Sequence, residues 1–428
     1  MKILHVNAFY APVRGGAEMH LKELSEGLAA RGHDVTVLTT NLGTLWDIDR
    51  RRCADLPAVE VINGVTVRRL RPNDGWCGKA LDGWLEMKGG YRSLSVALGD
   101  ERLEYLSQGF RNLSMVRTIA AADADIVACM NWYFAPAYHT YLARKMKVFR
   151  MVGIPLFHTT ARWCGRVIHS RMLQACDAVI ANTHHEADFM RGKGAARIQV
   201  AGVGVHPKAF EGPRGGEIRK RYGLGNHPVI GFVGRLMANK GATVLMQAMK
   251  TVWEWNAEVR LVLAGSVPPG SRELDEVLSG YGEAERSRVV IIREFVDADK
   301  PSIYDAFDVF ALPSTSESFG IAYLEAWLCK KPVIGAHSGS TPSVVLDGID
   351  GVLVDPTDAV ALGHALIDLL SQPEKRRRLG ENGYAKTLAH YTWDKVTDTV
   401  ERLYQDLICS KTSHTSSVAV GRQQHYST

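Results

Sequence analysis

The feature that most constrains the fold is a repeated alternation of short apolar runs with segments of helical periodicity. Residues 2–7 form an apolar run, a Pro/Gly loop covers 10–16, a helical pattern covers 17–30, and residues 34–39 form the next run. This order is typical of a parallel βαβ unit. Further runs lie at 125–130, 148–153, 178–181, 228–233, 259–264, 289–292, 309–312, 332–335 and 351–354. The chain is therefore expected to be an α/β protein with parallel sheets.

The length of the chain indicates more than one domain, because 428 residues exceed what a single hydrophobic core usually serves. The two series of apolar runs meet at a segment rich in Gly and Pro, near 206–225. We therefore expect one Rossmann-like domain over residues 1–205 and a second over residues 206–391.

Three further segments depart from this alternation. Residues 65–122 are rich in Gly, Trp and Arg around helical stretches, and are expected to form an insertion in the first domain. Helical spacing over about 392–409 predicts a C-terminal helix. The polar, Ser/Thr-rich segment 410–428 is expected to be a disordered tail.

Composition argues against several classes of protein. No apolar run approaches the roughly 20 residues that span a bilayer, and the first residues lack the apolar region of a secretory signal, so a cytoplasmic protein is expected. Seven cysteines without a Cys-x-x-Cys pair argue against a disulfide framework or a zinc site. The stretch His184-His185-Glu186 has Phe189 where a metalloprotease helix needs a second histidine, so a capping or surface role is favoured.

Positive charge is concentrated in the first half of the chain. Residues 1–206 carry a net charge of +7 and residues 207–428 carry −2, which gives +5 for the whole chain. Such a surface suits an acidic acceptor, an anionic membrane or a nucleic acid, or is a solvated charged face. The arginine-rich insertion with Trp76 and Trp84 makes peripheral membrane contact a hypothesis. No base-reading or stacking motif accompanies the charge, so no nucleic-acid partner is expected.

Loops that follow the apolar runs carry residues suited to binding an anion. Gly15 and Gly16 open a helix, where a phosphate or sugar can approach the backbone, although a plain helix start has the same pattern. Arg235 and Lys240 follow the run at 228–233 and can converge on a diphosphate, unless they are surface charges.

The stretch ESFGIAYLE, residues 317–325, follows the apolar run at 309–312. Ser318, Phe319 and Gly320 form a corner before a helix that begins near Gly320, so the N–H groups of Phe319, Gly320 and Ile321 are expected to be free for phosphate oxygens. Glu317 precedes the corner and Glu325 lies more than one turn into the helix, where both can accept hydrogen bonds from sugar hydroxyls. The alternative is a capping acid at Glu317 and an exposed glutamate at Glu325.

Together these motifs resemble the retaining GT-B-fold glycosyltransferases of family 4, also called glycosyl transferases group 1. The resemblance covers most of the chain, in order. It is carried by GGAEMHLKELSEGLAARGHDVTVLTT, PLFH, ACDAVIANTHHEADFM, VAGVGVHPKAF, GFVGRLMANKGATVLMQAM, LVLAG, YDAFDVFALPSTSESFGIAYLEAWLCKKPVIG and DGIDGVLVDP. It implies two Rossmann-like domains facing across a cleft that closes when the donor binds, and a C-terminal helix that returns to the first domain.

The resemblance also implies roles for individual residues. It assigns the donor diphosphate to Arg235 and Lys240, the sugar to Glu317, the ribose to Glu325, the phosphate or transferring sugar to Gly16, and the surroundings of the base to Glu294 and Phe295. A catalytic histidine is expected at His158, with His139 as the second choice. His206 stands where family members often have aspartate.

The expected reaction is therefore transfer of a hexose-type sugar from a UDP- or GDP-linked donor to an acceptor hydroxyl, with retention. The acceptor is a small molecule, a glycan or a lipid-linked sugar. No cofactor or metal is expected, because the two cations and the helix N–H groups can meet the charge of the leaving diphosphate. The triplets Asp123-Ala124-Asp125 and Asp297-Ala298-Asp299 are attributed to chance. A nucleotide-sugar 2-epimerase and a catalytically silent nucleotide-sugar-binding protein are the alternatives.

Overall fold

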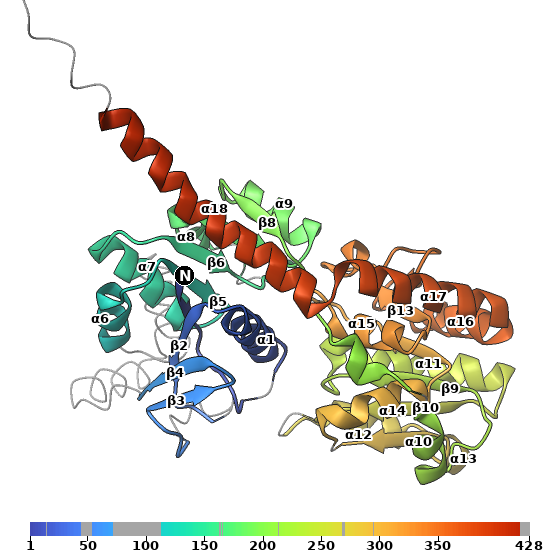
Figure 1. The fold of residues 1–428 in the computed structure, drawn as a ribbon. Coiled ribbons are helices and arrows are strands. Elements are labelled where there is room, and N and C mark those ends of the chain that lie inside the picture. Colours follow the sequence, from blue (N-terminus) through green and yellow to red (C-terminus); the bar gives the residue numbers. More distant parts are fainter. Residues whose placement is uncertain are drawn as a thin grey trace, which may run out of the picture.

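The computed structural model describes residues 1–13, 15–43, 54–71, 113–161, 164, 166–212, 214–267, 270–293 and 295–419, with the side chains of 113 and 411–419 left out. Within these ranges the chain forms two α/β lobes, each built on its own sheet (Figure 1). A front lobe holds the first half of the chain and a rear lobe the second. The predicted α/β class with two parallel, Rossmann-like sheets is confirmed.

The sheet of the front lobe has the described strand order β3-β4-β2-β1-β5-β6-β7-β8. Neighbouring strands are parallel except β3 and β4, which pair antiparallel at the edge. The strands are β1 (Lys2–Val6), β2 (Asp34–Thr40), β3 (Val59–Ile62), β4 (Val65–Leu70), β5 (Ile126–Met130), β6 (Met151–Ile154), β7 (Ala178–Ala181) and β8 (Ile198–Val200). Its helices are α1 (Gly16–Ala30), α6 (Leu113–Ala121), α7 (Ala135–Met146), α8 (Val167–Ala175) and α9 (His184–Gly192).

The sheet of the rear lobe is parallel throughout its described strands, in the order β11-β10-β9-β12-β13-β14. These strands are β9 (Val229–Val233), β10 (Arg260–Ala264), β11 (Val289–Ile292), β12 (Val309–Leu312), β13 (Val333–Ala336) and β14 (Gly351–Val354). Its helices are η2 (Pro207–Phe210), α10 (Gly215–Arg221), η3 (Ala238–Lys240), α11 (Ala242–Trp255), α12 (Glu273–Ser279), α13 (Glu283–Arg286), η4 (Asp297–Asp299), α14 (Lys300–Asp305), α15 (Ile321–Leu328), η5 (Thr341–Ser343), α16 (Ala359–Ser371) and α17 (Pro373–His390).

Both sheets are buried on their two faces, which explains why their strands are apolar runs rather than alternating ones. In β1, Leu4 and Val6 pack into one apolar cluster of the front lobe, whereas Ile3 packs into another on the opposite face. The central strand β9 of the rear lobe is buried along its whole length. The cores therefore hold the strand ends, and the loops that follow them, in fixed positions.

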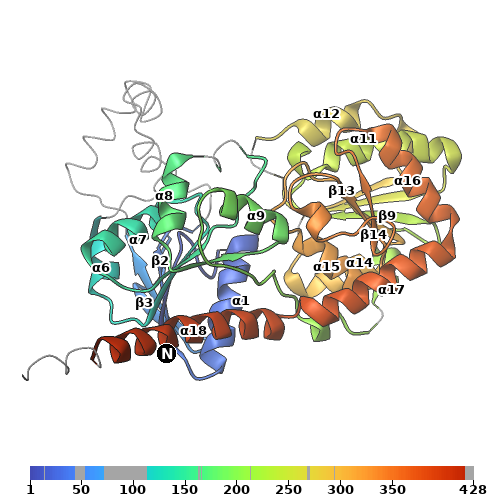
Figure 2. The ribbon, with the colours of Figure 1, turned by 90° about the horizontal axis from the view of Figure 1, so that it is seen from above.

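The last helix, α18 (Trp393–Ala419), connects the two lobes. Figures 1 and 2 show it leaving the rear lobe and running along the front lobe beside α1. Val396 belongs to the rear core, and Val400, Leu403, Tyr404 and Leu407 belong to a cluster of the front core. The chain thus crosses between the lobes a second time.

The two crossings lie side by side. The N–H of Val205 donates to the carbonyl of Tyr391 at 2.9 Å, and the N–H of Trp393 donates to the carbonyl of Val205 at 3.3 Å. One paired segment therefore serves as the joint between the lobes.

Some elements differ from those expected. The edge strand β3 and the strand β4 belong to the front sheet, although β4 falls in the segment expected as an insertion; residues 72–112, with Trp76 and Trp84, lie outside the described residues. The disordered tail over 410–428 is wrong for its first part, because α18 continues to Ala419. The sequence holds no Gly or Pro between Trp393 and Gly421, so no residue of that kind ends the helix earlier. Along the described chain, no helix has the length and apolar character needed to cross a bilayer.

Candidate active site

The order of the rear strands reverses between β9 and β12. The chain leaves the carboxyl ends of these two neighbouring strands in opposite directions. The crevice between the two departing segments is the usual ligand-binding site of an α/β sheet. The loop after β9 carries Arg235 and Lys240, and the loop after β12 carries Glu317 and the corner before α15. Arg235, Lys240, Glu317 and the corner before α15 therefore come together at one edge of the rear sheet.

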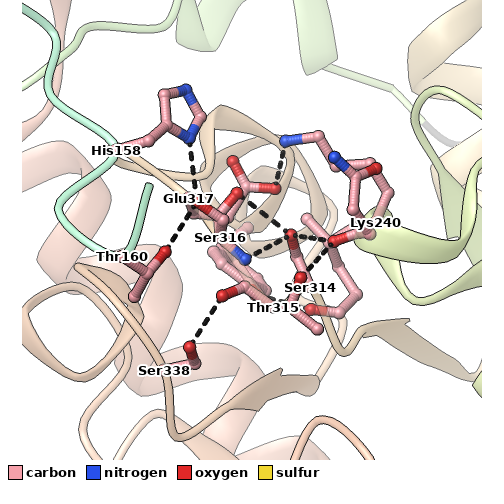
Figure 3. A network of polar contacts seen from close by, with 11 residues as sticks. His158, Thr160, Lys240, Ser314, Thr315, Ser316, Glu317 and Ser338 are labelled. Carbon is pink, nitrogen blue, oxygen red and sulfur yellow. Dashed lines mark hydrogen bonds and ion pairs between the residues drawn. The ribbon is translucent and has the colours of Figure 1, made fainter. Parts of the chain in front are cut away.

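Lys240 and Glu317 form an ion pair in this place, with 2.7 Å between Nζ and Oε1 (Figure 3). Both side chains are largely buried, at 13% and 10% exposure. Their loops are joined by the carbonyl of Asn239, which accepts from the N–H of Thr315 at 3.0 Å and from the hydroxyl of Ser314 at 3.0 Å. The pair is thus held by backbone contacts on both sides.

Two glycines allow this close approach. Gly241 has φ of 85°, and a Cβ atom there would lie 2.4 Å from the carbonyl oxygen of Pro313. Gly320 has φ of 93°, and a Cβ atom there would lie 2.5 Å from the ring of Tyr323. Only glycine fits both the left-handed conformation and the contact.

The helix α15 begins after Gly320 and presents its N-terminus to the same place. In the described part of the chain, no acceptor is found for the N–H groups of Phe319, Gly320 and Ile321. Unpaired N–H groups at a helix N-terminus attract anions. Beside the ammonium of Lys240, they form a site suited to a diphosphate.

The front lobe reaches this site through the loop after β6. His158 Nδ1 lies 3.2 Å from the hydroxyl of Ser316, and the hydroxyl of Thr160 donates to the same oxygen at 2.9 Å (Figure 3). Burial, and after it the ammonium of Lys240, lower the pKa of His158, so its imidazole is neutral at pH 7. The histidine expected in the front domain therefore contacts the rear loop that carries Glu317.

A buried carboxylate, Glu186 of α9, fixes the backbone on which His158 stands. Its two oxygens accept from the N–H of Phe157 and the N–H of Asn182, both at 2.7 Å. Leu156, just before this anchor, has φ of 58°, a conformation that is uncommon for a residue with a side chain. Burial raises the pKa of Glu186 to about 7. The turn that aims His158 at the rear lobe thus depends on this carboxylate.

Sequence reasoning assigned Glu186 only a capping or surface role. Thr183 does accept from its N–H at 3.1 Å, as the Thr-x-x-Glu spacing of a capping box indicates. This capping-box motif was the signal in the sequence that could have drawn attention to Glu186. The reach of the carboxylate to Phe157 could not be deduced, because it joins two segments that are distant in the sequence.

Glu325 is placed differently from Glu317. Its two oxygens accept from Lys300 Nζ at 2.9 Å and from the hydroxyl of Tyr304 at 2.7 Å. It is buried, which contradicts the alternative of an exposed glutamate. Each carboxylate oxygen can accept a further hydrogen bond, so the ribose role remains a prediction.

The other predicted residues are distributed as follows. Arg235 is exposed and has no ion pair with the described residues. Gly15 and Gly16 stand at the start of α1 in the front lobe. Phe295 packs against the rear core, whereas Glu294 lies outside the described residues.

The second-choice histidine, His139, is buried in α7, and burial lowers its pKa to about 4. Its Nδ1 atom has no partner among the described residues, but no contact places the ring at the rear loops. The geometry therefore favours His158 over His139.

The two Asp-x-Asp triplets are engaged in local structure. Asp123 pairs with Lys2 Nζ, and Asp125 accepts from the N–H of Lys2. Asp297 pairs with Lys300, and Asp299 accepts from the N–H of Val296. The described residues contain no group of three or more His, Cys, Asp or Glu side chains placed to hold a metal ion.

Two family models match the chain. Residues 216–386 match the model described as glycosyl transferases group 1, and residues 15–205 match the glycosyl transferase 4-like domain. The first match falls on the rear lobe, and the second falls on the front lobe.

Curated relatives match over most or part of the chain. A D-inositol 3-phosphate glycosyltransferase from Xylanimonas cellulosilytica is 31% identical, over 91% of each chain. A GDP-mannose-dependent alpha-(1-6)-phosphatidylinositol monomannoside mannosyltransferase from Mycolicibacterium smegmatis is 34% identical, over 41% of this chain and 47% of that protein.

Solved structures share the fold at lower identity. Sucrose-phosphate synthase from Thermosynechococcus elongatus superposes with a TM-score of 0.72 at 20% identity, covering 96% of this chain and 99% of that one. HepE from Anabaena, solved with UDP and glucose, superposes with a TM-score of 0.70 at 18% identity, covering 95% and 99%. These likenesses show the GT-B arrangement of two lobes.

Proposed function

Because the chain belongs to the glycosyl transferases group 1 family and is a glycosyltransferase that uses nucleotide sugars, we propose that it transfers a hexose-type sugar from a UDP- or GDP-linked donor to an acceptor hydroxyl, with retention at the anomeric carbon. The observation that carries this proposal is the convergence of Lys240, Glu317 and the N-terminus of α15 at one edge of the rear sheet, in contact with the His158 loop of the front lobe.

The chemistry of the leaving group explains why this arrangement suits the reaction. Breaking the bond between sugar and diphosphate develops negative charge on the phosphate oxygens. Lys240, held by Glu317, and the N–H groups of Phe319, Gly320 and Ile321 are fixed before the donor binds, and preorganised charges of this kind lower the barrier. The exposed Arg235 adds a second cation from the same loop as Lys240. The proposed reaction therefore needs neither a cofactor nor a metal ion.

The opposite end of the donor requires groups that bind hydroxyls. The carboxylate of Glu317 keeps one oxygen, Oε2, outside its ion pair with Lys240, and this oxygen is available for a sugar hydroxyl. His158, neutral and bound to the Ser316 hydroxyl, faces the same loop. We propose that these two residues position the hexose between the lobes, whereas Glu325 takes the ribose hydroxyls.

The names of relatives and solved structures suggest which donors and acceptors to test first. One relative is named for GDP-mannose, and HepE was solved with UDP-glucose. Several relatives are named for D-inositol 3-phosphate. We therefore propose UDP-glucose and GDP-mannose as first donors to test, and D-inositol 3-phosphate among the first acceptors.

The test is a screen of the purified chain against these donors. Slow hydrolysis of one nucleotide sugar in the absence of acceptor, together with thermal stabilisation by the matching nucleoside diphosphate, is the expected result. A donor that binds without turnover under any acceptor condition would favour a silent binding protein, and isomerisation of the sugar without acceptor would favour an epimerase.

A further inference from the structure

A lysine to which the sequence motifs assign no role joins the loop after β11 to the helix α15. Lys300 is the first residue of α14, directly after η4, and its Nζ atom lies 2.9 Å from Oε1 of Glu325 and 3.1 Å from Oδ1 of Asp297. The side chains of Lys300 and Glu325 are largely buried, at 25% and 11% exposure, whereas that of Asp297 is 54% exposed. The buried partner of this lysine is therefore Glu325.

Tyr304, one turn further along α14, binds the other oxygen of Glu325. Its hydroxyl donates to Oε2 at 2.7 Å, and its ring is buried among those of Phe210, Phe307 and Phe310. Burial raises the pKa of Tyr304 well above its usual value, so the hydroxyl keeps its proton and remains a donor. Two donors from one helix thus hold the carboxylate of Glu325 by both oxygens, in one orientation.

The ammonium of Lys300 stays charged in this position. Burial lowers its pKa, but the carboxylates of Glu325 and Asp297 outweigh burial, and the pKa of Lys300 is raised. A carboxylate that is withdrawn from water without an opposite charge is costly, and tends to take up a proton or to turn back toward water. Lys300 therefore offsets the cost of keeping the carboxylate of Glu325 beside α14.

Each oxygen of Glu325 keeps room for a further donor. A carboxylate oxygen can accept two hydrogen bonds, and among the described residues each oxygen of Glu325 has a single donor. The 2′ and 3′ hydroxyls of a ribose present two donors side by side, which suits the two oxygens of one carboxylate. This match requires both oxygens to stay where Lys300 and Tyr304 hold them.

We propose that Lys300 is a positioning residue for the nucleoside half of the donor: by holding Oε1 of Glu325, it makes the site select a ribose over a 2′-deoxyribose. Lys300 needs no contact with the nucleotide for this role. The inference rests on the proposed function, because it assumes that Glu325 takes the ribose hydroxyls. Since Lys300 follows the loop that carries Phe295, its ion pair also ties the segment expected near the base to the helix that carries Glu325.

A merely structural tie between α14 and α15 is the competing interpretation. Loss of such a tie would lower stability, and would weaken the binding of every nucleotide by the same factor or not at all. Loss of a positioned carboxylate would instead weaken only those ligands that carry the 2′ hydroxyl, typically by about tenfold or more for a hydrogen bond to a charged group. The ratio of two affinities therefore separates the two interpretations.

The experiment compares the wild type with Lys300→Met, Lys300→Arg and Lys331→Met. Methionine removes the charge and keeps an unbranched side chain, whereas arginine restores a cation. Lys331 is the matched control, because its ammonium pairs with Asp305 of the same helix at 3.4 Å but precedes β13, at the opposite edge of the sheet from the site. Calorimetry measures the affinities for UDP, 2′-deoxy-UDP, GDP and 2′-deoxy-GDP, and thermal unfolding is recorded for each protein.

We expect the wild type to bind its ribonucleotide at least about tenfold more tightly than the 2′-deoxy form. In Lys300→Met this ratio should fall below about threefold, while the affinity for the 2′-deoxy form stays unchanged, because the hydrogen bond that depends on Glu325 is absent there in both proteins. Lys300→Arg should restore most of the ratio, and Lys331→Met should keep the wild-type ratio.

The proposal is overturned if Lys300→Met keeps the wild-type ratio, or if it weakens the ribonucleotide and its 2′-deoxy form equally. A wild type without any preference for ribose, a result that needs no variant, would also overturn it, because Glu325 would then not take the ribose hydroxyls. A wild type that binds neither UDP nor GDP would instead contradict the proposed function itself.

Discussion

Lys240 and Glu317 are the residues on which the proposed chemistry depends most. Each is largely buried, and each is the nearest opposite charge of the other. Removing the ammonium takes away a cation proposed for the diphosphate and leaves the carboxylate without its partner. Residue-scale tests therefore begin with this pair.

We predict that Lys240→Ala and Glu317→Ala each lower the turnover of the donor at least a hundredfold with the fold intact. Loss of one charge-stabilising group typically costs about 2.7–4 kcal/mol of transition-state stabilisation. The measurement is the steady-state rate of donor hydrolysis, with circular dichroism to check folding. Lys250→Ala, at an exposed lysine of α11, is the control; near-normal turnover in either site variant would remove that residue from the mechanism.

Glu186 allows a second residue-scale prediction. In Glu186→Gln the amide can accept from only one of the two N–H groups, and a buried unpaired N–H costs about 1–3 kcal/mol. We expect kcat for donor hydrolysis to fall about tenfold while nucleotide affinity is unchanged, because the His158 turn is affected and the rear lobe is not. Glu283→Gln, on the exposed face of α13, is the control.

The same residue predicts a pH dependence. Protonation of Glu186 removes an acceptor from the His158 turn, and its pKa is raised to about 7. We therefore expect the wild-type rate to fall as the pH drops through about 7, and Glu186→Gln to lack this acid limb. A wild-type rate that stays constant from pH 8 to 6 would show that the carboxylate does not control the turn.

At the residue scale, sequence reasoning succeeded where the chemistry is local. The corner at Phe319–Gly320, the helix after it and the cations after β9 could all be deduced from loops that follow apolar runs. Glu186 was missed as a site residue, because its significance comes from burial and from a contact with the N–H of Phe157 that joins distant segments. The sequence pattern shows only a helix-capping acid at Glu186.

At the scale of elements, α18 is the part of the fold that holds the lobes together. Its first turn packs into the rear core, and Val400, Leu403, Tyr404 and Leu407 pack against α1 and the front sheet. Tyr404 also approaches His5 of β1, with 3.3 Å between its hydroxyl and Nε2. The helix therefore contributes to the stability of both lobes.

We predict that Leu403→Ala lowers the free energy of unfolding by about 2–5 kcal/mol, the usual cost of truncating a buried leucine. Gln405→Ala, two residues further on the exposed face, is expected to change it by less than about 0.5 kcal/mol. Denaturant unfolding measures both values. Equal and small effects would show that α18 does not pack on the front lobe as described.

At the joint between the lobes, a residue that opens the rear lobe also contacts the helix α1 of the front lobe. His206 Nε2 lies 2.6 Å from Glu23 of α1, and this hydrogen bond raises the pKa of His206. The resemblance seen in the sequence implies that family members often have aspartate at this position, and aspartate beside Glu23 would be repulsive. The sequence alone gave no chemical reason for histidine at position 206. The structure gives one, because His206 forms an ionic contact with Glu23 of α1.

Strands could be predicted from the sequence where they are short, continuous apolar runs. The central strands were found within a few residues, whereas the edge strand β3 was missed because its face is exposed, with Val61 69% accessible. The length of α18 was underestimated because polar residues after Cys409 do not show the apolar periodicity on which the prediction relied.

At the scale of the whole molecule, four buried histidines determine how stability depends on pH. Burial lowers the pKa of His5 to about 3 and the pKa values of His20, His139 and His169 to about 4. The unfolded chain binds protons at these groups near pH 6.5, and the folded chain does not. Above pH 6.5 these four histidines therefore leave the free energy of unfolding unchanged. As the pH falls from 6.5 toward 4, they lower it.

Two groups act in the opposite direction. The raised pKa values of Glu186 and His206 favour the folded state at lower pH. Because the histidines are more numerous, we predict a net loss of unfolding free energy between pH 6.5 and 4.5, on the order of several kcal/mol. In His139→Asn this slope should be shallower, whereas His364→Asn, at an exposed position of α16, should keep the wild-type slope. A free energy that is constant over this range would contradict the assignment of neutral buried imidazoles.

The most direct test of the central claim is a crystal structure of the chain with its nucleoside diphosphate. We predict the diphosphate within hydrogen-bond distance of Lys240, Arg235 and the N–H groups that open α15. A diphosphate bound away from the start of α15, or one that leaves the side chains of Lys240 and Arg235 pointing into solvent, would contradict the proposed site.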